Sequence, residues 1–236
     1  MKYVESISDF FKSPKWVMNL LFAGICILIP IVGPIVLMGW LITGFWMRND
    51  ERPETFPDFD FGKFGQYLQL GLWPFLTTFV ASMGVFFVFF IIGLIPSFIL
   101  GMMADRDGGF IGILIGLIWL VVYAAIFLVI TLIAHPIAIG GTLKQDFMGA
   151  FDLAFIKRFV SLMWKETIIG ALFMLVASTV LSIVGMLALC IGIYFAMGLV
   201  YYAWAHLSKQ MYGLYLSRGG APIPVSPKLT DGSIIA

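Results

Sequence analysis

Charged residues are scarce in this sequence of 236 residues. Asp, Glu, Lys and Arg together make up 11% of it, whereas hydrophobic residues make up 61%. An average soluble domain has about 25% charged and about 45–50% apolar residues. The 14 Lys+Arg and 13 Asp+Glu nearly cancel, which excludes nucleic acid as the main partner, because binding to phosphates requires an excess of positive charge. The composition is instead that of an integral membrane protein.

Cysteine and histidine are also rare, at two residues each. Cys26 and Cys190 both stand within apolar stretches, so the sequence indicates no disulfide framework. His135 and His206 each stand near an expected helix end, with no other ligand-type residue three or four positions along, and HExxH and CxxC motifs are absent. We therefore predict no metal site and no cofactor, and we interpret both histidines as lying at the level of the lipid headgroups.

Catalytic chemistry lacks its usual residues as well. No Asp, Glu, Lys or Arg falls within the long apolar stretches, where an ionisable residue would mark a proton or ion pathway. Ser178, Thr179 and Ser182 share one expected helix, but no Gly-x-Ser-x-Gly motif presents a nucleophile. Hydroxyls in membrane helices usually bond to the carbonyl one turn back. We predict that the protein is not an enzyme and has no catalytic residues.

The pair Asp58 and Asp60 is the nearest approach to an acidic site. The two carboxylates could bind a cation or work as acid and base. Alternatively, their loop is a structural cap whose aromatic rings lie at the membrane interface. These rings belong to Phe56, Phe59, Phe61 and Phe64. We favour the cap, because the sequence fixes no third acidic ligand nearby.

Four long stretches contain no charged residue. They lie between Lys15 and Arg48 (32 residues), Lys63 and Asp105 (41 residues), Asp107 and Lys144 (36 residues), and Glu166 and Lys209 (42 residues). Each exceeds the roughly 20 residues that a helix needs to cross a hydrocarbon core about 30 Å thick. The last stretch would be about 63 Å long as one helix, so we expect it to fold back between Ser182 and Gly185.

These stretches predict an all-α, polytopic membrane protein with about six apolar helical segments. The segments form a short broken hairpin, a long hairpin and a short hairpin. Their predicted limbs are Trp16–Ile29 with Ile31–Met47, about Tyr67–Ile95 with Phe110–Ile133, and Thr167–Val184 with Met186–Leu207. A polar turn, Asp105–Gly109, joins the limbs of the long hairpin.

The first stretch is interrupted by Pro30, Gly33 and Pro34, and the sequence leaves three paths open: a re-entrant hairpin, two complete spans or one kinked helix. Basic residues in short loops collect on the cytoplasmic side of a membrane. A hairpin places all Lys and Arg residues except Arg106 on one side, whereas a single kinked helix divides them ten to four. The charges favour the hairpin, with both termini cytoplasmic.

Two amphipathic segments predict helices that lie along the membrane interface. The first is Tyr3–Phe11. The second is Asp146–Lys165, which at 100° per residue gathers one apolar face and one basic face. The apolar face holds Met148, Phe151, Phe155, Phe159 and Leu162. The alternative for this second segment is an extension of the last hairpin. By composition we expect residues 1–215 to form a single integral membrane domain and residues 216–236 a flexible cytoplasmic tail.

Small and aromatic residues mark candidate contact surfaces. Gly112-x-x-x-Gly116 and Ser178-x-x-x-Ser182 permit close helix approach, more often within one protein than in a dimer. Four aromatic residues gather in the last expected helix: Tyr194, Tyr201, Tyr202 and Trp204. They either line a pocket for a lipid or hydrophobic solute or, with only Tyr194 deep, belong to an interfacial aromatic belt. We favour the belt.

Several motifs recur in an order that is similar to one known family. A break at Leu28-Ile29-Pro30-Ile31-Val32-Gly33 precedes Gly39-Trp40 and the loop Phe56-Pro57-Asp58-Phe59, and Ala150-Phe151-Asp152 and Ala205-His206-Leu207 follow. The sequence thereby resembles prokaryotic multi-pass membrane proteins grouped as domain of unknown function 4013, over about residues 10–215. The resemblance implies a helical membrane architecture in a bacterial inner membrane and no known activity.

Two function classes remain. We favour a non-enzymatic membrane module that binds membrane lipids, other membrane proteins or a second copy of itself. The alternative is a facilitator for a neutral or apolar small solute, because Gly/Pro-interrupted hydrophobic segments can mark a transport site. The scarcity of polar groups inside the apolar stretches favours the module. The sequence does not identify the ligand, partner proteins or oligomeric state.

Overall fold

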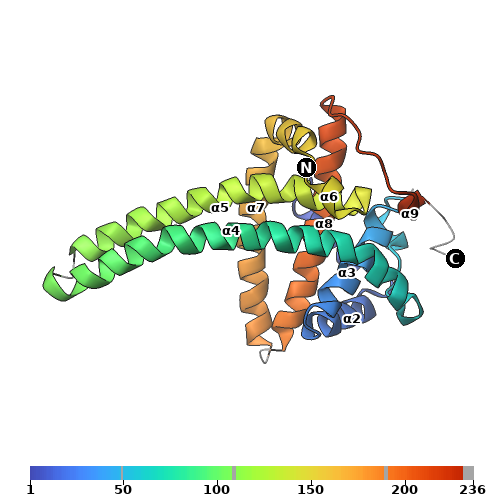
Figure 1. Ribbon diagram of the computed structural model, residues 1–236. Helices are drawn as coiled ribbons and strands as arrows, with labels where there is room; N and C mark the ends of the chain where they lie inside the picture. Colours follow the sequence, from blue (N-terminus) through green and yellow to red (C-terminus); the bar gives the residue numbers. More distant parts are fainter. Residues whose placement is uncertain (49, 108–109, 189–190, 231–236) are drawn as a thin grey trace.

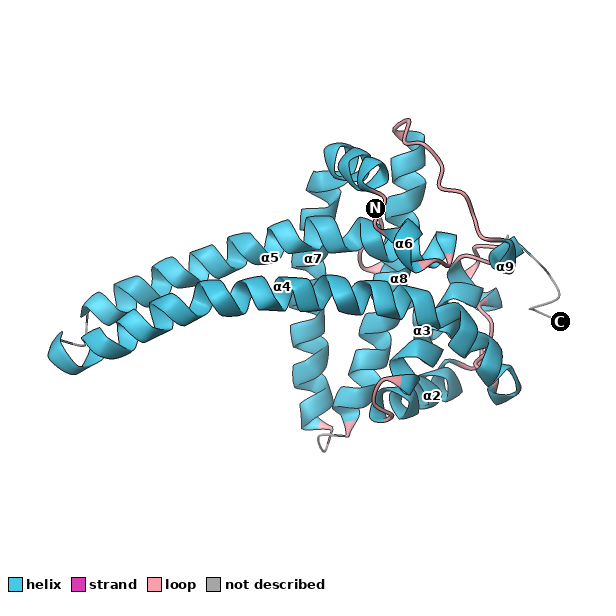
Figure 2. Cartoon of the chain, in the orientation of Figure 1, coloured by secondary structure: helices cyan, strands magenta, loops and turns pink. Residues whose placement is uncertain are grey.

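The computed structural model describes residues 1–48, 50–107, 110–188 and 191–230. The described part of the chain is helical and contains no strand (Figure 2). The helices are α1 (Glu5–Ser8), α2 (Trp16–Leu28), α3 (Val32–Phe45), α4 (Phe64–Asp107), α5 (Phe110–Lys144), α6 (Phe147–Ala150), α7 (Leu153–Leu187), α8 (Gly192–Ser217) and α9 (Pro227–Thr230). Short 3₁₀ turns at Asp9–Lys12, Pro53–Thr55 and Phe61–Lys63 complete the helical elements.

The helices form three hairpins, which confirms the predicted all-α membrane architecture. The pair α2 and α3 is the short broken hairpin, α4 and α5 are the long one, and α7 and α8 are the third. Figure 1 shows the α4–α5 hairpin crossing α7 and α8 and then projecting away from the other helices. Three described helical segments are long and apolar enough to cross a membrane: Phe61–Gly93, Gly116–Lys144 and Phe147–Leu187.

The break in the first apolar stretch turns the chain back on itself. Ile31 has φ +66°, a left-handed value that L residues rarely adopt. After this turn, the loop that follows α3 returns to the start of α2. The backbone N–H of Phe59 donates to Asn19 Oδ1 at 2.9 Å, and Lys15 Nζ lies 3.0 Å from an Asp58 carboxylate oxygen. The structure therefore has the predicted hairpin, and the single kinked helix is excluded.

The two limbs of this hairpin are short. Helix α2 has 13 residues and α3 has 14, which correspond to about 20 Å each at 1.5 Å per residue. A hydrocarbon core is about 30 Å thick. Of the three paths open in the sequence, the helix lengths fit a re-entrant pair best.

Glycines allow α3 and α4 to pack with their backbones in contact. A Cβ atom on Gly39 would overlap the carbonyl of Tyr67, and one on Gly71 would overlap the carbonyl of Ile35. Small residues are the usual means of close approach between membrane helices. The predicted seam at Gly116 is different, because a Cβ atom there would meet nothing within 4 Å. Gly112 belongs to α5, and its surroundings lie outside what the structure describes.

The prediction of an interfacial helix over Asp146–Lys165 is wrong. Helix α7 begins at Leu153 and runs without a break to Leu187, so most of the segment extends the last hairpin. Phe155 and Phe159 are buried in a cluster with Tyr215. Their cover is the C-terminal part of α8, which continues to Ser217, ten residues beyond the predicted end. This extra length supplies the apolar surface that the sequence prediction left out.

Asp152, which interrupts the amphipathic pattern, caps the beginning of α7. Its Oδ1 atom accepts hydrogen bonds from the backbone N–H groups of Ala154 at 3.0 Å and Phe155 at 3.2 Å. Lys144 Nζ donates to its Oδ2 atom at 2.8 Å. A carboxylate at a helix N-terminus satisfies N–H groups that the helix itself leaves unpaired. The residue therefore has a structural explanation.

The predicted flexible tail differs from the structure over residues 218–230. Ile223 and Leu229 are buried against the body of the protein. The backbone N–H of Ser226 donates to the Leu143 carbonyl at 2.8 Å, and that of Ile223 donates to the Tyr212 hydroxyl at 2.9 Å. The composition of the tail is polar and proline-rich, but its few apolar residues are enough to fix it. Residues 231–236 lie outside the described part.

The N-terminal segment covers α8 from another side. Phe10 is buried, with its ring centroid 5.0 Å from that of Tyr202. The backbone N–H of Lys2 donates to Gln210 Oε1 at 2.8 Å. The predicted helix over Tyr3–Phe11 is present as α1 and the following turn, and part of its apolar face packs against the protein itself.

Candidate functional site

A cavity of about 450 Å³ lies where the long hairpin crosses the third hairpin. We call it the lateral cavity. All four helices α4, α5, α7 and α8 contribute to its lining. The size is within the range of small-molecule sites, roughly 300–1,000 Å³.

His135 is a buried member of the lining of the lateral cavity. The residue is 2% exposed, and its ring packs edge to face against Trp204 with centroids 5.1 Å apart. Phe159 contacts it from α7, at 5.9 Å between centroids. Neither ring nitrogen has a hydrogen-bond partner in the part of the chain that the structure describes. A buried polar group without a partner costs about 1–3 kcal/mol.

Thr78 also lines the cavity and carries a second unsatisfied polar atom. Its Oγ1 atom is buried and, like the His135 nitrogens, has no partner among the described residues. Other hydroxyls nearby are satisfied within their own helices: Thr131 donates to the Phe127 carbonyl at 2.9 Å and Ser178 to the Leu175 carbonyl at 3.1 Å. The lateral cavity therefore holds two side chains with unused hydrogen-bonding capacity, one from each limb of the long hairpin.

The rim of the lateral cavity is apolar and open. Phe127 is 41% exposed and Leu175 is 51% exposed, and both line the cavity. They belong to the apolar spans of α5 and α7. Among the described lining residues none is Asp, Glu, Lys or Arg. The arrangement can hold an apolar molecule with a neutral polar group, and it cannot neutralise a charged one.

A smaller cavity of about 100 Å³ adjoins the lateral cavity. We call it the inner cavity. Thr78, Ala138 and Trp204 line both, so these three side chains stand between them. Trp46 and Tyr201 also line the inner cavity. The two cavities are therefore neighbours that share part of one wall.

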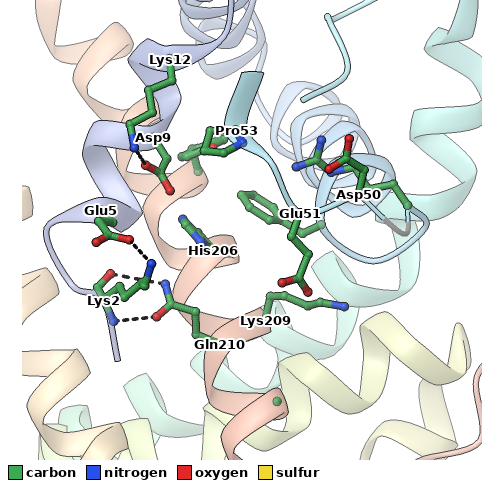
Figure 3. A pocket seen from close by; sticks show the side chains of 15 residues that line it. Lys2, Glu5, Asp9, Lys12, Asp50, Glu51, Pro53, His206, Lys209 and Gln210 are labelled. Carbon is green, nitrogen blue, oxygen red and sulfur yellow. Dashed lines mark hydrogen bonds and ion pairs between the residues drawn. The ribbon is translucent and has the colours of Figure 1, made fainter. Parts of the chain in front are cut away.

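A third hollow, of about 440 Å³, is lined by charged residues of both signs. Figure 3 shows it between the N-terminal segment, the loop after α3 and α8. Two of its three lysines pair with neighbouring carboxylates: Lys2 lies 2.8 Å from Glu5, and Lys12 lies 2.7 Å from Asp9. The contact with Asp9 raises the pKa of Lys12 above its ordinary value. The hollow also contains His206, whose Nδ1 atom has no partner among the described residues. Its lining is largely charged, so it indicates an apolar ligand less strongly than the lateral cavity does.

Two acidic residues of the loop after α3 have structural roles. Asp58 accepts from Asn19 Nδ2 at 3.2 Å, and Asp60 accepts from the backbone N–H of Gly62 at 2.8 Å. Their partners differ, so the structure does not bring the pair together as a site. Groups of three or more His, Cys, Asp or Glu side chains placed to hold a metal ion do not occur among the described residues.

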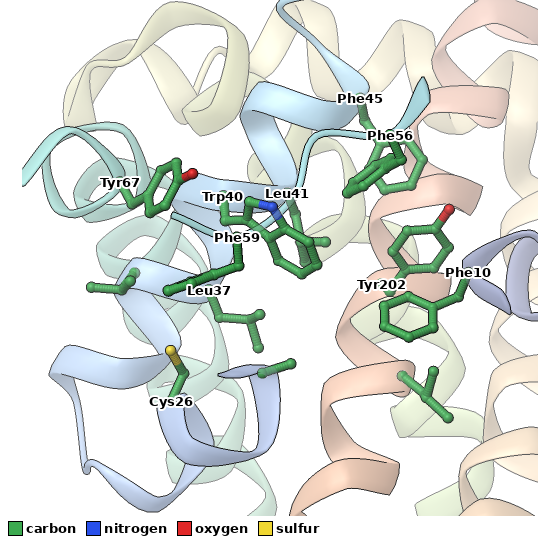
Figure 4. Close-up of a cluster of buried hydrophobic side chains, with 13 residues drawn as sticks. Phe10, Cys26, Leu37, Trp40, Leu41, Phe45, Phe56, Phe59, Tyr67 and Tyr202 are labelled. Carbon is green, nitrogen blue, oxygen red and sulfur yellow. The ribbon is translucent and has the colours of Figure 1, made fainter. Parts of the chain in front are cut away.

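The rings of that loop lie inside the protein more than at its surface. Phe56 and Phe59 are buried against Trp40, as Figure 4 shows, whereas Phe61 is exposed. The indole N–H of Trp40 donates to the Pro57 carbonyl at 2.9 Å and fixes the loop. The prediction of a structural cap is confirmed for the carboxylates, and the interfacial position is wrong for the two buried rings.

The aromatic residues of α8 divide between two environments. Tyr202 is buried in the core cluster with Phe10 and Phe45. Trp204 lines both cavities and Tyr201 lines the inner one. Tyr202 is therefore a core residue, and Trp204 and Tyr201 fit the pocket alternative. The depth of these rings in a membrane, on which the belt interpretation depends, stays a prediction.

The sequence predicts that both histidines lie near a helix end, at the level of the lipid headgroups. This position is wrong for His135, and for His206 the prediction omits the hollow that it lines. Helix α5 continues to Lys144, eleven residues past its expected end, so His135 stands inside the helix bundle. His206 lines the charged hollow and stacks on Phe45, with centroids 5.2 Å apart. Sequence reasoning missed Thr78 altogether. A lone histidine in an uncharged stretch, followed by Pro136, is the signal that could have indicated the site.

One protein-family model matches residues 22–191, described as a protein of unknown function, DUF4013. The chain belongs to the DUF4013 family. No curated protein and no solved structure matches it. The family match confirms the resemblance seen in the sequence, and it spans Thr78 and His135. The DUF4013 match ends before Ala205-His206-Leu207, so that part of the resemblance stays a prediction.

Proposed function

We propose that this DUF4013 protein is a non-enzymatic integral membrane module that holds a membrane lipid, or a molecule like one, in the lateral cavity. The observation that carries the proposal is the pairing of an open apolar rim with the unsatisfied polar atoms of His135 and Thr78. A ligand that reaches such a cavity from the bilayer buries its apolar part at the rim and satisfies the polar atoms of the lining residues.

The surroundings of the cavity support entry from the bilayer. The most apolar stretches of α4 and α5 are almost entirely unburied in the isolated chain: 6% and 0% of their residues are buried. Because such surfaces do not persist in water, lipid or another membrane protein covers them. We include partner membrane proteins or a second copy of the chain as candidates for the flanks of the long hairpin.

The proposed location is the cytoplasmic (inner) membrane, with both termini cytoplasmic. The distribution of Lys and Arg supports this orientation. So does the contact between Lys2 and Gln210, because it brings the N-terminal segment and the end of α8 to one end of the molecule.

A cavity-filling substitution tests the function. Ala134 lines the lateral cavity, whereas Ala125 lies on the exposed surface of the same helix, outside the cavity. The wild type and the variants Ala134→Phe and Ala125→Phe are purified in detergent, and the lipids that remain bound after extensive washing are extracted and identified by mass spectrometry. We expect the wild type and Ala125→Phe to retain a defined lipid near one per protein, and Ala134→Phe to lose it.

Two results would overturn the proposal. One is a wild-type protein that retains no lipid in defined ratio. The other is retention that Ala134→Phe leaves unchanged while its thermal unfolding in detergent matches that of Ala125→Phe.

The inner cavity favours one second candidate, a facilitator for a neutral or apolar small solute. It is separated from the lateral cavity by Thr78, Ala138 and Trp204, so movement of these side chains would join the two into a path. Flux of neutral solutes such as glycerol into liposomes that contain the protein, compared with protein-free liposomes, tests this alternative. Flux that Ala138→Phe abolishes would favour the facilitator over the binding module.

A further inference from the structure

We propose that the ligand of the lateral cavity is a neutral amphiphile whose polar head both donates and accepts hydrogen bonds, such as a long-chain alcohol. The inference rests on the proposed function and specifies its ligand. It depends on which atoms of the lining residues are left unsatisfied, and on which charges the lining lacks.

The unsatisfied atoms require a head with both capacities. A neutral imidazole has one N–H donor and one acceptor nitrogen, and both nitrogens of His135 lack a partner in the described chain. The Thr78 hydroxyl adds a further donor and acceptor. A hydroxyl head can accept from one group and donate to another. An ester can only accept, so it would leave an acceptor of the protein unpaired.

The lining disfavours charged heads. Thr78, Ser82, Thr131, His135 and Ser178 are its polar members, Trp204 adds an indole N–H donor, and its other described members are apolar. A carboxylate or phosphate brought into this lining would be desolvated without a cation to pair with it, and an ammonium group without a carboxylate. Phospholipids therefore fit this lining less well than neutral amphiphiles do.

Aromatic contacts hold the imidazole in place for this role. The Trp204 and Phe159 rings pack against His135 from α8 and α7. Neither ring contact uses the hydrogen-bonding capacity of the nitrogens, since both nitrogens remain without a partner in the residues described. A donor and an acceptor that are held in place discriminate between ligand head groups better than mobile ones do, because the side chain loses less conformational freedom on binding.

A competition between three probes with the same chain length tests the ligand class. Delipidated protein in detergent is incubated with equal concentrations of dodecanol, methyl dodecanoate and dodecanoate, and the bound species are quantified by mass spectrometry. We expect the wild type to bind dodecanol over methyl dodecanoate by a factor on the order of tenfold, the effect of about one buried hydrogen bond. We expect dodecanoate to bind least.

Three variants assign the preference to its residues. His135→Phe keeps a ring of similar shape without nitrogens, and Thr78→Val replaces the hydroxyl with a methyl group; each should reduce the dodecanol preference several-fold while methyl dodecanoate still binds. His135→Gln retains a donor and an acceptor and should keep much of the preference. Because valine has nearly the same shape as threonine, Thr78→Val still tests the preference if the His135 variants fail to fold.

The outcomes separate this inference from the function on which it rests. Equal binding of all three probes, blocked by Ala134→Phe but unaltered by His135→Phe and Thr78→Val, overturns the ligand class and leaves lipid binding standing. Preferential binding of dodecanoate also overturns it. Absence of binding by any probe, together with unchanged lipid retention in Ala134→Phe, overturns both.

Discussion

Trp204 packs its ring edge to face on His135, with the two centroids 5.1 Å apart. The contact joins α8 to α5 at the point where the third hairpin crosses the long one, and it forms part of the wall of the lateral cavity. A site built across two hairpins depends on each hairpin being correctly placed. The first predictions below concern that placement, and the last concerns the site.

Asn19 fixes the broken hairpin through hydrogen bonds to the returning loop. Its side chain is buried and binds Asp58 and the backbone N–H of Phe59. We expect Asn19→Ala to lower the free energy of unfolding by about 2–3 kcal/mol, because it leaves a buried N–H group unpaired. Lys15→Ala removes only an exposed ion pair with Asp58 and should cost less than about 1 kcal/mol. Thermal unfolding of both variants in one detergent measures the difference, and equal losses would argue against this role for Asn19.

Ile31 occupies a backbone conformation that costs free energy. With φ +66°, a β-branched residue is strained, whereas glycine adopts the same conformation readily. Ile31→Gly should therefore raise the stability by about 1 kcal/mol, after allowance for the greater freedom of glycine in the unfolded chain. Ile29 is the control, because its φ of −92° is ordinary and Ile29→Gly should be destabilising. Chemical denaturation of both variants tests the expectation, and a loss of stability in Ile31→Gly would refute it.

The apolar face of the amphipathic segment contains one residue that tests burial and one that serves as its control. Phe159 is fully buried in a cluster with Tyr215, while Met148 is exposed. Phe159→Ala should cost about 3–5 kcal/mol through the cavity that it creates, and Met148→Ala should change the stability by no more than about 0.5 kcal/mol. Unfolding in detergent gives both values. Similar small effects for the two variants would restore the interfacial helix that the structure excludes.

Accessibility to a membrane-impermeant thiol reagent tests the topology. In a background without Cys26 and Cys190, single cysteines at positions 50, 157 and 218 should be protected in intact cells, and one at position 107 should be labelled. The expectation follows from the one-sided distribution of Lys and Arg. Labelling at position 50 together with protection at position 107 would reverse the orientation.

The helical segments and their order follow from the sequence because uncharged length is a strong constraint in a membrane. The break near Pro30 and the hairpin that it makes follow from the same reasoning together with loop charge. The sequence predicts the ends of the helices less accurately than their order. Helices α5 and α8 run past the predicted ends at Ile133 and Leu207, because charged and polar residues continue a helix where other helices cover it.

The misplaced ends of α5 and α8 explain why the sequence does not predict the candidate site. With α5 ending at Ile133, His135 would lie at the interface, and with α8 ending at Leu207 nothing would cover Phe155 and Phe159. Thr78 carries no sequence signal, since a threonine in an apolar helix usually bonds to its own backbone, as Thr77 does with Pro74 at 3.1 Å. Which hydroxyl is left over depends on how helices far apart in the sequence cross.

Nitrogen NMR of the histidine rings tests the central claim most directly. The protein has two histidines, so ¹⁵N labelling of histidine alone gives signals from His135 in the lateral cavity and His206 in the charged hollow. On addition of dodecanol to delipidated protein, we predict that the His135 ring nitrogens shift as they gain hydrogen bonds, that those of His206 stay in place, and that Ala134→Phe abolishes the shift. An unchanged His135 signal at dodecanol concentrations that saturate the wild type, or the same shift in Ala134→Phe, would contradict the account.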